Sequence, residues 1–419
     1  MEQLHARCAG LDVHQATVVA CALIDEGKRT PRKEIRTFGT MHAELLELRE
    51  WLRRLGITHV AMEGTGVYWR PVYSVLEGDV DLTVANATHI KNVPGRKTDV
   101  VDAQWIATLL RFGLLRKSFV PSKDIREIRE LTRYRRKLVQ AETAEKNRIV
   151  KLLEIAGIKL ASVASDVFGK SGMLMLQALV EGDKTAPEMA ASACGRMRSK
   201  IPALTQALNV TVDDHHRLLL RKQLRRLTAT QGEVADLDKH IGKRVAPYAE
   251  QLALLCTIDG IDEVAAREIF AETGPDLSTF EHERAFAAWS GLCPGMRQSA
   301  GKDRSARRRR GNRHLQGILV ESAFAASRKK NTYLADKHRR LKARRGPLRA
   351  LFAIAHKIGC AVFRVLKTRV AYKDLGANYL DSRDRSRTAR SLILRLKTLG
   401  YAVSLLPPRS EPEGSPAPA

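Results

Sequence analysis

Four carboxylates near the start of the chain have positions suited to phosphodiester chemistry. Asp12 lies inside an apolar run, and Glu63 ends a second apolar run. Asp99 and Asp102 open a helical pattern, and their spacing of three places both side chains on one helix face. Four carboxylates brought together repel one another unless hard cations such as Mg²⁺ lie between them. Two ions about 4 Å apart would hold the attacking and leaving oxygens of a phosphodiester.

A structural interpretation of the same acids competes with this one. An acid at the end of a strand is commonly a turn or capping residue, and the chain has 46 acidic residues in all. Asp12 is harder to explain in that way, because a carboxylate inside an apolar strand costs free energy unless it is paired.

A serine beside a dense cationic segment is the second chemical feature. Ser299 lies in a glycine-flanked loop, and neighbouring cations would stabilise the charge that develops when a hydroxyl attacks a phosphodiester. Ser290 and Ser305 lie close by in sequence and are alternatives, and a loop serine is most often a turn residue. We expect phosphate contacts from a turn glycine and a set of cations, namely Gly260, Lys302, Arg304, Arg307, Arg308, Arg309, Arg310 and Arg313.

Charge and composition point to a nucleic-acid partner. The 419 residues carry 72 Lys and Arg against 46 acids, a formal net charge of +26. Residues 1–100 are neutral, with 13 basic and 13 acidic residues, whereas residues 301–350 hold 17 basic and 3 acidic ones. No apolar run is long enough to span a membrane, and the first residues do not resemble a signal peptide. Six scattered cysteines without a Cys-x-x-Cys pair fit a cytoplasmic protein without a zinc site.

The element order predicts the fold of the first part. Three strands in a meander precede a helix, a strand, a helix, a strand and a helix, the order of a ribonuclease H-like domain. In that fold the acids lie on the first strand, after the fourth strand and on the closing helix, where Asp12, Glu63 and the Asp99/Asp102 pair are found. The predicted strands are 8–13, 17–24, 33–38, 57–63 and 80–85, and the helices are 41–55, 67–77 and 98–112.

The rest of the chain is predicted to be mainly helical. Residues 122–156 and 213–245 read as two long amphipathic helices that form a hairpin or coiled coil, around a stretch at 160–210 without a usable motif. Residues 255–266 have the form of a helix-hairpin-helix, whose turn would present backbone N–H groups to a phosphate. Helices at 282–290, 314–329 and 347–371 follow, and the end from Pro407 is expected to be disordered.

Two groups of motifs make the chain similar to a known family. It resembles the DEDD transposases of bacterial insertion sequences, the recombinases guided by a bridge RNA. The N-terminal motifs are Gly10-Leu11-Asp12-Val13-His14, Met62-Glu63-Gly64-Thr65-Gly66-Val67-Tyr68 and Lys97-Thr98-Asp99-Val100-Val101-Asp102-Ala103. The C-terminal motifs are Ile258-Asp259-Gly260-Ile261, Phe286-Ala287-Ala288-Trp289-Ser290-Gly291-Leu292-Cys293-Pro294, Gln298-Ser299-Ala300-Gly301-Lys302 and Arg310-Gly311-Asn312.

The resemblance implies an architecture and a set of partners. It implies a RuvC-like α/β domain at 1–118, an all-α coiled-coil region at 119–250, a mainly α transposase domain at 251–380 and a partly disordered tail at 381–419. Four acids would bind Mg²⁺, two ions in all, and Ser299 would form a covalent ester with DNA. Donor and target DNA and a structured guide RNA are the implied partners, and a homodimer or homotetramer would form composite sites.

Three hypotheses follow from these residues. The first is a transposase that cuts and exchanges DNA strands through a serine ester. The second is a metal-dependent nuclease of the Holliday-junction-resolving type, in which activated water attacks and Ser299 is a loop residue. The third is a nucleic-acid-binding protein without catalysis, which the presence of all the acids does not favour.

Overall fold

The protein forms two compact units in the computed structural model, Met1–Pro121 and Ser122–Ala419. The structure describes residues 3–64, 66–86, 90, 102–293, 295, 298–299, 302–303 and 311–404, with the backbone alone at 298–299 and 302–303. Within this part of the chain, no helix is long and apolar enough to cross a membrane.

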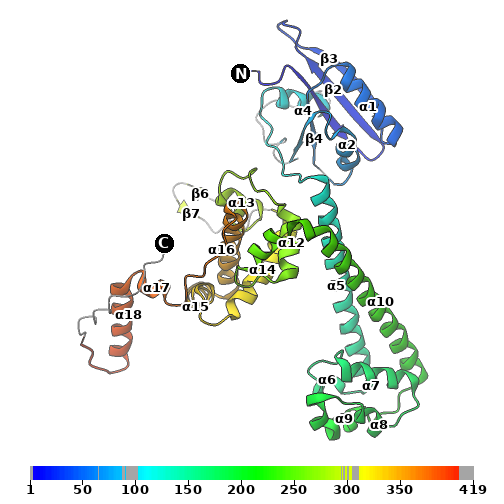
Figure 1. The fold of residues 1–419 in the computed structure, drawn as a ribbon, viewed down its shortest axis with the longest axis vertical. Helices are drawn as coiled ribbons and strands as arrows, with labels where there is room; N and C mark the ends of the chain where they lie inside the picture. Colours follow the sequence, from blue (N-terminus) through cyan, green and yellow to red (C-terminus); the bar gives the residue numbers. More distant parts are fainter. Residues whose placement is uncertain are drawn as a thin grey trace. The chain divides into compact units, whose positions relative to one another are not determined.

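A five-stranded mixed sheet with the order β3-β2-β1-β4-β5 forms the centre of the first unit (Figure 1). The first three strands pair antiparallel, as expected for a meander, and β1, β4 and β5 pair parallel. The strands are β1 (Arg7–Val13), β2 (Thr17–Ile24), β3 (Arg32–Gly39), β4 (His59–Glu63) and β5 (Asp81–Ala85). The helices are α1 (His42–Arg54), α2 (Trp69–Leu76) and α4 (Asp102–Arg111).

The two faces of this sheet carry separate apolar cores. Leu11 of β1 and Met62 of β4 lie on the face covered by α1 and α2. The alternate residues Cys8 and Ala61 lie on the other face, which α4 covers with Ala103 and its neighbours. A mixed sheet covered in this way, followed by helical regions, is compatible with the expected ribonuclease H-like class of fold.

The second unit contains two long helices that pack side by side in opposite directions (Figure 1). They are α5 (Lys123–Ile155) and α10 (Asp214–Val245). Arg135 binds Asp238 through two hydrogen bonds of 2.6 and 2.9 Å, and Gln231 donates to Glu142 at 2.9 Å. The two helices are antiparallel, because the residue numbers of these bonded pairs rise along α5 and fall along α10.

The stretch between the long helices is folded. It contains α6 (Leu160–Val163), α7 (Lys170–Glu181), α8 (Ala186–Ala191) and α9 (Ile201–Leu208). These helices share a core with the adjoining ends of α5 and α10, in which Leu153, Leu204 and Leu227 are almost fully buried. The absence of a recognisable motif at 160–210 therefore did not mean an absence of structure.

Four of the remaining helices, α11, α13, α14 and α15, contact α16 (Pro347–Thr368). Phe286 is fully buried and lies against Phe280 and Phe363. The elements are α11 (Ala249–Cys256), α12 (Glu263–Thr273), α13 (Glu283–Trp289), β6 (Gln298–Ser299), β7 (Lys302–Asp303), α14 (Arg313–Arg328), α15 (Tyr333–Arg345), α17 (Tyr379–Ser382) and α18 (Arg385–Thr398).

The structure agrees with most of the predicted elements and adds several that were not predicted, including the helices of the 160–210 stretch. The helices α15, α17 and α18 had no counterpart in the sequence interpretation. The predicted start of α4 at 98–101 and the tail beyond 404 lie outside the described residues.

Candidate functional site

Strand register places two of the predicted carboxylates beside each other. The parallel pairing of β1 with β4 runs to Leu11 and Met62, and the next residue of each strand is an acid, Asp12 or Glu63. Because side chains alternate along a strand, both acids belong to the face that carries α4 rather than to the α1/α2 face.

The N-terminus of α4 is directed to the same end of the sheet. Cys8 contacts Ala107, whereas Gly10 lies against both Ala103 and Ala107, so the helix runs back along β1 with its first residues toward Asp12. A Cβ atom on Gly10 would lie 2.2 Å from the Ala103 carbonyl oxygen, so only glycine permits this approach. Asp102 is the first residue of the helix and therefore lies at this end of the face.

A complete ligand set is not present among these acids alone. Asp12 is partly exposed and lies 3.2 Å from His14, measured between Oδ2 and Nε2. In the described ranges, no three or more His, Cys, Asp or Glu side chains are grouped closely enough to hold a metal ion, and Asp99 lies outside those ranges. The carboxylate oxygens on this face suit a hard cation such as Mg²⁺ by their chemistry, and a full site would need Asp99 as well.

The predicted nucleophile lies on a short hairpin. Ser299 in β6 pairs with Lys302 in β7, and Gln298 pairs with Asp303. The alternative Ser290 is fully buried, and its hydroxyl donates to the Phe286 carbonyl oxygen at 2.8 Å. A buried and hydrogen-bonded hydroxyl is unsuited to attack DNA, whereas Ser305 lies outside the described residues.

The two ends of the segment that contains the hairpin are held together. The Asn312 backbone N–H donates to the Trp289 carbonyl oxygen at 2.9 Å, and Gln316 donates to the Gly291 carbonyl oxygen. Gly311 packs so closely against Gly291 that an added Cβ atom would lie 2.3 Å from the Gly291 nitrogen. The residues that flank the segment 292–310 therefore meet at one point of the helical domain.

A buried ion-pair network secures that point. Asn312 caps α14 through its Oδ1 atom and donates from Nδ2 to Glu272 of α12 at 2.7 Å. The Glu272 side chain is 2% exposed and accepts two hydrogen bonds from Arg133 of α5, at 2.7 and 2.8 Å. Burial alone would raise the pKa of Glu272, but Arg133, Arg129 and Asn312 outweigh it and hold the pKa below its usual value.

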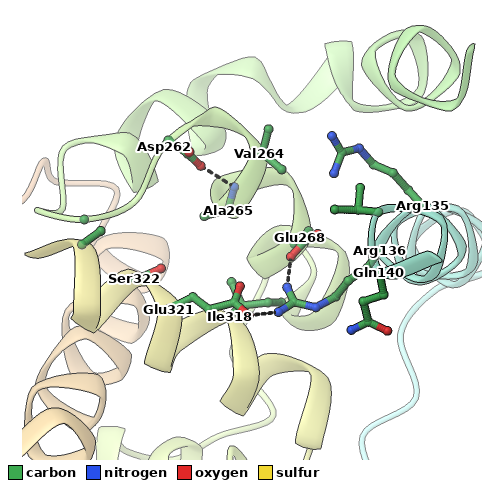
Figure 2. Close-up of a pocket in the computed structure, with 13 residues that line it drawn as sticks. Arg135, Arg136, Gln140, Asp262, Val264, Ala265, Glu268, Ile318, Glu321 and Ser322 are labelled. Atoms are coloured by element: carbon green, nitrogen blue, oxygen red, sulfur yellow. Dashed lines mark hydrogen bonds and ion pairs between the residues drawn. The ribbon is translucent and has the colours of Figure 1, made fainter. Parts of the chain in front are cut away.

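A second buried acid lies one turn earlier on α12. Figure 2 shows Arg136 of α5 between Glu268 of α12 and Glu321 of α14. Arg136 donates to Glu268 at 2.6 Å. Burial raises the pKa of Glu268 above its usual value, because one guanidinium shared with Glu321 does not offset it. The cavity at this junction has a volume of ≈ 360 Å³.

The predicted phosphate-binding residues are only partly described. Gly260 has a left-handed conformation with φ +88° and packs against Ser322 and Ala326 of α14, which explains the need for glycine at this turn. Arg313 is exposed at the start of α14. The side chain of Lys302 is not described, and Arg304, Arg307, Arg308, Arg309 and Arg310 lie outside the described residues.

Sequence reasoning did not single out Glu272, Arg133 or Asn312 as residues of the site. Glu272 and Arg133 are separated by 139 positions, and in sequence each resembles the polar side of an amphipathic helix. Asn312 carried a usable signal, because asparagine directly before a helical pattern is typical of an N-cap.

Comparison with known proteins agrees with the motifs. A DEDD-type transposase family matches residues 9–157, and the transposase IS116/IS110/IS902 family matches residues 252–339. A probable family 20 transposase of Pseudomonas aeruginosa is 27% identical over 285 residues, 67% of this chain and 75% of that protein. The transposase for insertion sequence element IS1111A of Coxiella burnetii is 27% identical over 292 residues, 68% and 71% of the two chains.

These matches, in the order of the two sets of motifs, define the protein as a transposase, an enzyme that cleaves and recombines DNA. The two family matches together cover more than half of the chain. The chain belongs to the IS110/IS116/IS902 family of transposases.

Proposed function

We propose that this transposase is an RNA-guided recombinase that joins donor and target DNA through a covalent serine–DNA intermediate. The observation that supports it most directly is the meeting of Asp12, Glu63 and the start of α4 at one end of one sheet face. This arrangement occurs in a chain whose second family match contains Ser299.

Each group has a separate role in this proposal. Asp12, Glu63, Asp99 and Asp102 would hold Mg²⁺, as two ions in the manner of related phosphoryl-transfer sites, and bound Mg²⁺ would supply Lewis-acid stabilisation of the phosphate. The Ser299 oxygen attacks phosphorus, so that an Oγ–P bond forms and the P–O3′ bond breaks. The serine proton passes to a base or to solvent, and the neighbouring cations hold the phosphate in line.

The helical elements would bind and assemble the nucleic acids. The α11–α12 turn with Gly260 serves as a helix-hairpin-helix, and Lys302 and Arg313 join Arg304 and Arg307–Arg310 on phosphates. The α5/α10 pair acts as a coiled coil in a homodimer or homotetramer, where acids of one subunit meet the serine of another. A structured guide RNA would select the DNA sites in the cytoplasm.

A denaturing-gel assay tests the covalent step. The protein, Mg²⁺, the RNA encoded by its element and an end-labelled DNA site are incubated and quenched in SDS. We expect a DNA band shifted by the mass of the protein, which Ser299→Ala abolishes. Ser290→Ala is the matched control and should retain the band, because the Ser290 hydroxyl is buried and donates to the Phe286 carbonyl oxygen of its own helix.

The carboxylates are tested in the same assay. Asp12→Ala and Asp102→Ala should each remove both cleavage and the shifted band. Cleaved DNA without attached protein, formed equally by the Ser299→Ala variant, would contradict the serine ester and would identify a nuclease that uses activated water.

A further inference from the structure

A groove on the surface of the second unit has not been given a role above. It is formed by the end of α14, the connection to α15, one side of α15 and the start of α16, and its volume is ≈ 750 Å³. We call it the α14–α16 groove. Its lining includes Phe324, Arg328, Lys330, Lys342 and Leu348.

Positive charge in this region greatly exceeds negative charge. Residues 328–349 contain ten Lys and Arg and one acid, Asp336. That acid is buried and already binds Arg340 at 2.6 Å and Arg339, and Lys329 binds Asp259 at 2.5 Å. For the lining cations Arg328, Lys330 and Lys342, the described part of the chain shows no acidic partner.

Apolar surface lies among these cations. Phe324 is 49% exposed, and the Arg328 guanidinium lies over its ring at 4.1 Å from the centroid. Leu348 is 72% exposed on the α16 side of the groove. A ligand that covers both kinds of surface must combine flat apolar faces with repeated negative charge.

We propose that the α14–α16 groove binds a single-stranded segment of nucleic acid. One base stacks on Phe324, beside the guanidinium that already lies on that ring, and the phosphates follow Lys330 and Lys342. A single strand is specified because the bases of a duplex are stacked on one another and do not offer a free face to Phe324. An enzyme that exchanges strands necessarily exposes such segments, and the inference does not depend on the role of Ser299.

Binding of labelled oligonucleotides to the full-length protein tests the stacking contact. Fluorescence anisotropy is measured with a thymidine oligomer of about 12 nucleotides, within the site sizes known for single-strand binders, and with a duplex of the same length. Phe324→Ala should weaken binding of the single strand by roughly tenfold and leave the duplex nearly unchanged. The control is Tyr134→Ala, which removes another ring, 55% exposed on α5. It should change the affinity for neither the single strand nor the duplex.

Two further variants examine the geometry and the charges. Phe324→Trp should keep the affinity, and its added fluorescence should be quenched when the thymidine oligomer binds. The double variant Lys330→Ala/Lys342→Ala should reduce the slope of log affinity against log salt by about 1.4, since each contact with a single strand contributes about 0.7. Because all three side chains are exposed, melting temperatures should match the wild type.

The opposite results would overturn the proposal. Equal losses for single strand and duplex in Phe324→Ala would reduce the groove to a general phosphate surface. Unchanged binding in Phe324→Ala, or unquenched fluorescence in Phe324→Trp, would exclude stacking on this ring. A uridine oligomer in parallel shows whether RNA or DNA is held more tightly, and either preference agrees with the proposal provided that the variants respond as stated.

Discussion

Two glutamates one turn apart on α12 have opposite pKa shifts because their partners differ. Glu272 is contacted by Arg133, Arg129 and Asn312, and its pKa is lowered from the usual 4.5. Glu268 shares Arg136 with Glu321, and burial raises its pKa. The first carboxylate therefore stabilises the fold when ionised, whereas ionisation of the second opposes folding.

This difference predicts opposite pH dependences for two matched variants. The contribution of Glu272 is complete above pH 4.5 and is lost as the pH falls through its lowered pKa. Glu272→Gln should therefore lower the melting temperature most at neutral pH, and Glu272→Ala should cost about 3–5 kcal/mol there, as expected when one partner of a buried pair is removed. The difference in stability between these variants and the wild type should shrink at acidic pH.

The matched control is Glu268→Gln, measured in the same thermal melts from about pH 3 to 8. The stabilising contribution of Glu268 is present below pH 4.5 and is lost as the pH rises through its raised pKa. The melting temperature of Glu268→Gln should therefore rise relative to that of the wild type as the pH rises. If both variants followed the same pH trend, the two carboxylates would not differ in their environments in this way.

At the scale of elements, the contact of β1 with α4 controls the position of Asp102. Gly10→Ala would place a Cβ atom 2.2 Å from the Ala103 carbonyl oxygen, so the helix must move outward. We expect a loss of about 1–3 kcal/mol from overpacking and a strong loss of DNA cleavage, since the acid at the start of α4 moves with the helix. Thermal melts and the cleavage assay measure the two effects.

A glycine in another helix provides the control for that substitution. A Cβ atom added to Gly242 in α10 would have no atom within 4 Å apart from the adjacent backbone of its own helix, so Gly242→Ala should be neutral or stabilising by up to about 1 kcal/mol. Cleavage by Gly10→Ala at the wild-type rate would show that α4 tolerates the shift and that the close approach does not position Asp102.

The link between α12 and α14 gives a prediction that can be tested by exchange of side chains. Asn312→Asp keeps the oxygen that caps α14 but loses the N–H donor. It also places the new carboxylate beside that of Glu272, so the two negative charges repel each other. We expect at least a tenfold loss of the SDS-stable adduct, because a hydrogen bond to a charged group contributes about 1.5–3 kcal/mol. DNA binding should be unchanged.

The reciprocal variant should restore the contact. In Asn312→Asp/Glu272→Gln the amide and the carboxylate have exchanged places, so the donor and acceptor are again complementary and the adduct should recover in large part. A double variant that is as inactive as the sum of the two single variants would show that this hydrogen bond does not hold the segment 292–310 in place.

Sequence patterns predicted some elements well and others not at all, for physical reasons. The strands with Asp12 and Glu63 were predictable because their apolar runs are bounded by turns. The helix α15 was missed because it is mostly charged and its buried residues are only Leu334 and Asp336. Short helices such as α8, with six residues, have too few turns to show a period.

The candidate site shows the same division. Residue types and motifs selected the candidate acids and the candidate serine, and the roles given to them are part of the proposal above. Which acids share a face depends on strand register, and the partnership of Glu272 with Arg133 depends on packing between distant helices. Neither is set by local sequence, so neither could be predicted from it.

For the whole molecule, the division into two units coincides with a division of charge. Residues 1–121 carry 16 basic and 14 acidic residues, whereas residues 122–419 carry 56 basic and 32 acidic ones. Nearly all of the net charge of +26 therefore belongs to the second unit. If the carboxylates of the first unit bind Mg²⁺ as proposed, a near-neutral unit supplies few cations that would compete with the metal for them.

This division predicts which unit determines the salt dependence of DNA binding. Because counterion release scales with the number of phosphates neutralised, residues 122–419 alone should bind duplex DNA with nearly the salt slope of the full chain. Each unit has its own apolar core, so the two parts can be tested separately. Residues 1–121 alone should bind DNA weakly and with a shallow salt slope. Anisotropy titrations between about 50 and 300 mM salt measure both slopes. If residues 1–121 supplied half of the salt slope, most of their basic residues would have to contact DNA phosphates. The unit that carries the carboxylates would then also bind the DNA.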